Sequence, residues 1–307
     1  MMVTHRYRLM LALAALPLAA CGLRVEEPDA AGSDVVVGIM EEHIDTTTGK
    51  PSAFVRAAFY KVGGAWKAYD PACDQGACFP RQTTWTVSRS GKAIGTVEGV
   101  TPSGWSTMGD VGRQSLAEGA KAPFVGEPSE TFSGWSGGSV RRPLVSVSSP
   151  NVSDPGEWKP MAVSANMAKA LHQRIRAKFP TAQRCASAEQ TEPAEWKYAD
   201  SDLVVDEAYS SGIGWKIARV GLNPDAYRCD GMLPDTGESA FSALTVAFAP
   251  DGELIDLGHD MRLLDTGDYD ADGRSELVFI FSHYNSDGYR LFSDDFNKSI
   301  TFGYSFH

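Results

Sequence analysis

A short run of acidic residues near the carboxyl end of the chain has the residue types and spacing of a cation site. Its five candidate ligands are Asp268, Asp270, Asp272, Arg274 through its carbonyl oxygen, and Glu276. Alternate side chains of a coiled loop point toward a common centre, and Gly273 permits the sharp turn that this coil requires. The spacing therefore predicts one loop that surrounds a single cation.

The chemistry of these ligands favours calcium. Four carboxylates this close together would repel one another strongly without a cation, and oxygen ligands suit a hard cation such as Ca²⁺. An EF-hand would place a glutamate at position twelve of the loop, where this chain has Phe279. The following run Leu277-Val-Phe-Ile-Phe281 predicts a buried strand and not an exiting helix. We therefore expect a structural calcium site that joins two strands.

The segment from Asp265 to Phe281 resembles the FG-GAP or VCBS-type repeat, whose D-x-D-x-D-G-x-x-D/E loop lies between strands of propeller-like folds. This chain has glutamate at the ninth position of the loop. The tetrapeptide Ser-Gly-Trp-Ser also occurs twice, at residues 103–106 and 133–136, a spacing that could mark propeller blades. A two-part β-rich arrangement is the alternative.

Most of the chain after residue 33 is predicted to form short strands separated by Gly, Pro, Asp and Ser. One amphipathic helix is expected from Ser164, as N-cap, to Phe179, because Pro180 follows and apolar residues recur every four positions. The predicted fold class is mainly β, possibly propeller-like in its strand arrangement, with one amphipathic helix. We expect a β-rich part over residues 34–160, and a helix plus a β-rich part with the calcium loop over residues 161–307.

The amino-terminal segment has the layout of a bacterial lipoprotein signal. Basic residues precede the apolar stretch Leu9 to Ala19, which is shorter than the roughly 20 residues that cross a bilayer, and Cys21 follows. This predicts a signal peptide over residues 1–20, lipid such as palmitate on Cys21, and a tether over residues 21–33. Gly22 stands where an aspartate would signal inner-membrane retention, so resemblance to lipoproteins generally implies outer-membrane sorting, and we expect the domain to face the periplasm.

Apart from Cys21, four cysteines in an exported chain predict disulfides, and three pairings of them are open. Cys73 and Cys78 lie in a turn-rich stretch that suits a local bridge, which would leave Cys185 to pair with Cys229. Zinc is the alternative for the close pair, although neither a second cysteine pair nor a histidine lies nearby in the sequence.

The overall charge and the scattered polar residues bear on the class of function. The chain has 28 basic and 39 acidic residues, so nucleic acid is a poor partner and a basic protein would be attracted. A G-x-S-x-G pattern around Ser136 lacks the flanking strand and helix of a nucleophile elbow, and the histidines form no metal-spaced pair. We therefore expect a non-enzymatic protein.

The run from Asp268 to Tyr289 loosely resembles the carboxyl-terminal region of Xanthomonas-type immunity lipoproteins. The resemblance implies an outer-membrane, calcium-containing β protein that inhibits a lysozyme-like peptidoglycan hydrolase. Lysozyme inhibitors use an S-G-x-x-Y-type loop, so the resemblance implies a contact loop with Ser282, Tyr284 and Tyr289 beside a turn at Asn285-Ser-Asp-Gly288. This chain departs from that loop, because His283 follows Ser282 where the motif has glycine. The alternative function is a surface adhesin or glycan-binding lipoprotein that uses exposed Trp and Tyr side chains.

Overall fold

The computed structural model describes residues 35–44, 49–73, 78–101, 110–132, 139–184, 194–223, 243–283 and 285–305. Several sequence predictions fall outside these ranges: the signal peptide, Cys21 and the tether, both Ser-Gly-Trp-Ser tetrapeptides with Ser136, Cys185, Cys229 and Tyr284. None of the described helices is long and apolar enough to cross a membrane.

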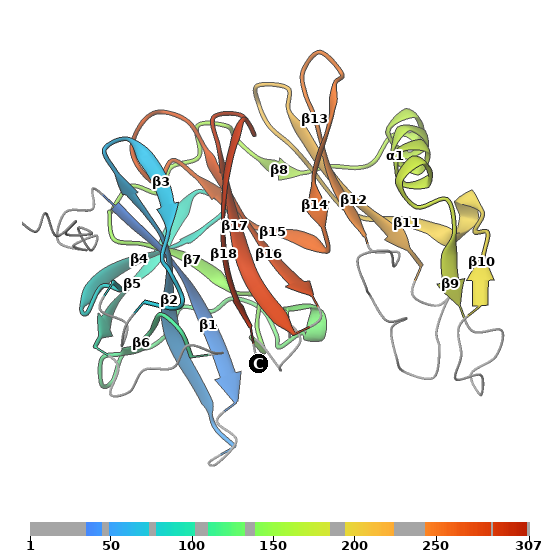
Figure 1. The fold of residues 1–307 in the computed structure, drawn as a ribbon. Coiled ribbons are helices and arrows are strands. Elements are labelled where there is room, and N and C mark those ends of the chain that lie inside the picture. Colours follow the sequence, from blue (N-terminus) through green and yellow to red (C-terminus); the bar gives the residue numbers. More distant parts are fainter. Residues whose placement is uncertain are drawn as a thin grey trace, which may run out of the picture.

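The amino-terminal strands close into a six-stranded antiparallel barrel (Figure 1). The order around the barrel is β1-β7-β4-β5-β6-β2, and pairing of β1 with β2 closes the ring. Closure pairs both edges of the sheet. The strands are β1 (Val35–Ile44), β2 (Pro51–Val62), β4 (Thr83–Arg89), β5 (Lys92–Val100), β6 (Arg113–Leu116) and β7 (Leu144–Val147); β3 (Ala65–Ala68) extends from β2, and a 3₁₀ turn spans Glu130–Phe132.

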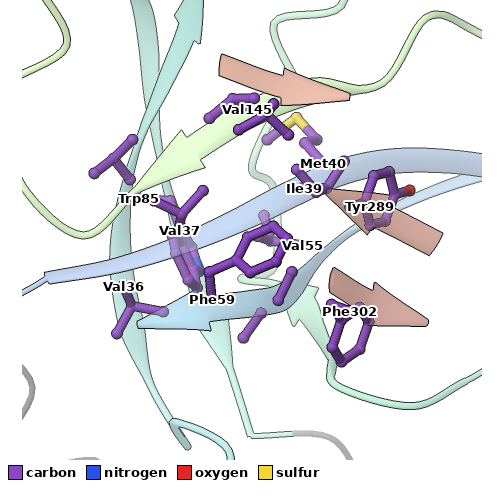
Figure 2. Close-up of a cluster of buried hydrophobic side chains, with 14 of the residues drawn as sticks. Val36, Val37, Ile39, Met40, Val55, Phe59, Trp85, Val145, Tyr289 and Phe302 are labelled. Atoms are coloured by element: carbon purple, nitrogen blue, oxygen red, sulfur yellow. The ribbon is translucent and has the colours of Figure 1, made fainter. Parts of the chain in front are cut away.

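Local sequence explains both the turns and the interior of the barrel. Ser90 and Gly91 both have positive φ, as a two-residue hairpin between β4 and β5 requires. Inward-facing Val37, Val55 and Trp85 are fully buried (Figure 2). The Trp85 indole donates to the Gln114 side chain at 2.8 Å. The barrel interior is therefore a packed core with its polar indole nitrogen satisfied.

A second antiparallel sheet has the order β14-β13-β12-β11-β8 and carries the helix α1 (Ala165–Lys178) on one face (Figure 1). Ser164 caps α1 by accepting from the Met167 backbone N–H at 3.3 Å, and Leu171 and Ile175 are fully buried, so the predicted helix is confirmed. The strands here are β8 (Lys159–Pro160), β11 (Leu203–Ser210), β12 (Lys216–Leu222), β13 (Leu244–Phe248) and β14 (Leu254–His259); β9 (Ala182–Arg184) pairs with β10 (Ala194–Trp196), and a 3₁₀ turn spans Asp200–Asp202.

The carboxyl-terminal strands form a four-stranded meander that packs against both the barrel and the second sheet. Along β16, Val278 belongs to the barrel core, whereas Leu277 and Phe279 join a core with Ile217 and Ala247 of the second sheet. Both faces of β16 are buried, which explains its uninterrupted apolar run. The four strands are β15 (Met261–Gly267), β16 (Glu276–His283), β17 (Ser286–Ser293) and β18 (Lys298–Ser305).

The mainly β fold class with one helix is confirmed, but the propeller-like alternative is wrong for the part of the chain that the structure describes. There the strands form a closed barrel, a five-stranded sheet, a meander and a two-stranded pair, and not a ring of similar blades. The barrel core includes residues of the meander, and so it extends across the boundary predicted between residues 160 and 161.

Candidate metal centre

The predicted calcium loop connects β15 to β16, as the sequence pattern requires. Ala271 and Gly273 have positive φ, and their left-handed backbone coils the chain around the first carboxylate. Asp268 accepts the backbone N–H groups of Asp272 at 2.9 Å and Gly273 at 3.0 Å. These hydrogen bonds fix the Asp268 carboxylate at the centre of the loop.

Three acidic residues meet in this loop. Carboxylate oxygens of Asp268, Asp270 and Glu276 all lie within 4.8 Å of one another, and this acidic triad can hold a metal ion. Asp268 is 7% exposed and Glu276 is 1% exposed. Three carboxylates supply hard oxygen donors of the kind that Ca²⁺ and Mg²⁺ prefer. The residues present therefore fit a divalent cation.

Electrostatics at Glu276 show that the negative charge of the triad is not balanced. Burial and the neighbouring charge of Asp270 raise the pKa of Glu276 from 4.5 to about 8. The Tyr269 backbone N–H donates to its carboxylate at 2.9 Å, which only partly offsets this rise. A divalent cation would supply the missing positive charge.

The side chains of Asp272 and Arg274 lie at the exposed rim of the loop. The Asp272 side chain is 38% exposed, and its carboxylate accepts the Arg274 backbone N–H at 2.9 Å. The Arg274 guanidinium lies 3.9 Å from the Asp294 carboxylate and is 60% exposed. The structure thus groups Asp268, Asp270 and Glu276, and leaves the Asp272 carboxylate outside the triad.

Lys61 is a residue of this site that sequence reasoning missed. It belongs to β2 of the barrel, and its ammonium forms an ion pair with Asp270 and lies 3.8 Å from Asp272. Burial opposes its charge, but the hydrogen bond and charge of Asp270 outweigh burial and raise the pKa of Lys61. Lys61 and Asp270 are 209 positions apart, so no local pattern could reveal their contact.

Asp154 is a second residue that the sequence did not single out. Its carboxylate accepts from the hydroxyl of Thr266 at 2.9 Å and from that of Ser275 at 2.5 Å. The carbonyl of Ser153 also accepts the Asp268 backbone N–H at 2.5 Å. The segment that leaves the barrel therefore contacts both ends of the acidic loop. In the sequence, the Asp-Pro-Gly pattern at residues 154–156 predicts a turn there but does not predict these contacts.

A separate charged cluster lies between the barrel and the meander. Arg56 is fully buried and donates to both carboxylate oxygens of Glu41, at 2.7 and 3.2 Å. Tyr289 donates to the same carboxylate at 2.9 Å, and His43 Nε2 lies 3.1 Å from it. Burial would raise the pKa of Glu41, but the charge of Arg56 and the hydrogen bonds with His43 and Arg56 together outweigh burial and hold that pKa well below its usual range.

The prediction that Tyr289 contacts a partner is wrong. Tyr289 is 2% exposed because alternate side chains of β17 face the barrel (Figure 2). Its hydroxyl donates to Glu41. The predicted turn is displaced too: Asp287 and Gly288 already pair with Ser282 and Phe281 in the ladder, and Asn285 has the positive φ. Ser282 lies half-buried near the end of this hairpin.

The local disulfide is confirmed. Cys73 and Cys78, which follow β3 in the sequence, are bonded with an S–S distance of 2.08 Å. Both cysteines pack against the barrel core. The zinc alternative for this pair is thereby excluded, since both sulfurs are used in the bridge.

Comparisons with protein-family models, with curated proteins and with solved structures found no match to this chain.

Proposed function

We propose that this chain is a calcium-stabilised, non-enzymatic binding module, anchored to the outer membrane through Cys21, that inhibits a lysozyme-like peptidoglycan hydrolase as an immunity protein does. The observation that carries the proposal is the acidic triad of Asp268, Asp270 and Glu276, in which Asp268 and Glu276 are buried. A lipid anchor that leaves the module facing the periplasm would place it where an incoming hydrolase acts.

Calcium is the ion that the donor set supports best. Ca²⁺ takes six to eight oxygen ligands in flexible geometry, and the triad supplies carboxylates while Asp272 stands close by at the rim. Mg²⁺ demands a nearly ideal octahedron and keeps several of its waters. When bound, the cation would neutralise the loop and lock β15 to β16.

Calcium would also act on the surface proposed to meet the partner. The loop lies at the start of β16, and the hairpin end with Ser282 and His283 lies at the other end of the same strand. A strand fixed at its base would hold this hairpin end in one position, which lowers the entropic cost of binding. The net charge of −11 would attract a basic protein partner.

The test of function is peptidoglycan hydrolysis by lysozyme-like enzymes, measured with excess purified protein in calcium and in EDTA. We expect slower hydrolysis that depends on calcium, and weaker inhibition by Ser282→Ala than by Ser299→Ala, a matched change at an exposed serine of β18. If no hydrolase from the host or from its competitors is slowed, the inhibitory role is wrong. Binding to a glycan array instead would indicate the adhesin alternative.

A further inference from the structure

The ion pair between Lys61 and Asp270 joins two parts of the protein that lie far apart in the sequence. Lys61 lies near the end of β2, within the barrel sheet, whereas Asp270 lies in the acidic loop of the meander. The Lys61 side chain is 14% exposed and the Asp270 side chain is 3% exposed, so both charges are largely withdrawn from water. A pair this buried is sensitive to any new charge beside it.

A divalent cation in the triad would be such a charge. The oxygens of Asp268, Asp270 and Glu276 that would hold it lie within 4.8 Å of one another, so the cation would sit beside the carboxylate that Lys61 already contacts. An ammonium and a divalent cation on one carboxylate repel each other, and the interior dielectric screens this repulsion poorly. The two cations therefore compete for Asp270.

Lys61 has a second partner that it can keep after losing Asp270. It stands directly opposite Trp66 in the β2–β3 ladder, and its ammonium lies 5.6 Å from the centroid of that indole ring. A cation near an indole face is attracted by the ring. Movement of the ammonium away from Asp270 would thus leave it over Trp66 and not isolated.

We infer that the Lys61 ammonium pairs with Asp270 in the metal-free protein and that this ion pair breaks when a divalent cation binds. This inference rests on the proposed metal site and concerns its regulation. Lys61 then lowers the calcium affinity of the site. The ion pair between β2 and the acidic loop forms only when the metal is absent.

The test is calorimetric titration of Ca²⁺ into the protein from residue 22 onward, which retains every residue that the structure describes. We expect Lys61→Met to bind calcium about tenfold more tightly than the unaltered protein. Lys61→Arg, which keeps the charge, and Lys67→Met, which removes an exposed charge from neighbouring β3, should bind as the unaltered protein does. Equal or weaker binding by Lys61→Met would overturn the inference.

Thermal unfolding provides a second readout that does not depend on the calorimetric affinity. In EDTA, Lys61→Met and Lys61→Gln should both melt below the unaltered protein, because Asp270 has lost its partner; in saturating calcium this deficit should disappear. An equal deficit in both conditions would mean that Lys61 stays on Asp270 with the metal bound, which contradicts the inference. No calcium binding by the unaltered protein would instead refute the metal site itself.

Discussion

Two charged clusters join the barrel to the meander, and they differ in how their charge is balanced. In the first, Glu41 and Arg56 are both buried, form two hydrogen bonds with each other and are joined by Tyr289. In the second, three carboxylates face one ammonium, that of Lys61. The first cluster is neutral within the protein, whereas the second keeps an excess of negative charge.

The two clusters differ in whether the protein itself balances the charge of its buried carboxylates. The carboxylate of Glu41 has its pKa lowered by Arg56, whereas burial and Asp270 raise the pKa of Glu276. A buried carboxylate with a raised pKa is one that the protein has not paired. The Glu41 cluster is therefore balanced without an added ion, whereas the triad would need a bound cation to balance its charge.

The largest expected effect comes from breaking the neutral cluster. Arg56→Met leaves Glu41 buried without its partner, and the free energy of unfolding should fall by about 3–5 kcal/mol, measured by urea denaturation. The double variant Glu41→Gln/Arg56→Met should lose less, because no buried charge remains. A double variant less stable than Arg56→Met would contradict the explanation that the loss comes from a buried Glu41 charge without a partner.

A smaller loss is expected at the link to the meander. Tyr289→Phe removes one hydrogen bond to the buried Glu41 carboxylate and should lower the free energy of unfolding by about 1.5–3 kcal/mol. Calcium should not change this loss, since Tyr289 belongs to the neutral cluster. A stability within about 0.5 kcal/mol of the unaltered protein would show that the Tyr289 hydroxyl is dispensable.

Removal of metal should expose a pH dependence at the second cluster. In EDTA the folded protein keeps the Glu276 proton up to about pH 8, whereas an ordinary glutamate loses it near 4.5. The folded state then binds more protons than the unfolded state between these values, so stability should fall as pH rises, by at most about 1.4 kcal/mol per pH unit.

Denaturation from pH 5 to pH 8 checks this slope. Calcium should flatten it, because the cation replaces the proton, and Glu276→Gln should flatten it without calcium. Identical slopes for Glu276→Gln and the unaltered protein in EDTA would assign the pH dependence to another group.

Local patterns predicted those features that depend on neighbours in the sequence. The helix followed from its N-cap and four-residue apolar spacing, and the grouping of Asp268, Asp270 and Glu276 followed from the loop spacing. The Glu41–Tyr289 hydrogen bond joins positions 248 apart, and chain topology alone brings them together. Tyr289 was misjudged because its face depends on the strand register, which a turn shifted by a few residues changes.

The measurement that tests the central claim most directly is thermal unfolding of the purified protein in calcium and in EDTA, with Asp270→Ala and Asp251→Ala compared. Asp251 is an exposed carboxylate in the β13–β14 turn and serves as the control. At free calcium about 100-fold above its dissociation constant, the unaltered protein and Asp251→Ala should gain about 2.7 kcal/mol and melt higher, and Asp270→Ala should not. Superimposable melting curves of the unaltered protein in calcium and in EDTA would contradict a calcium-stabilised fold.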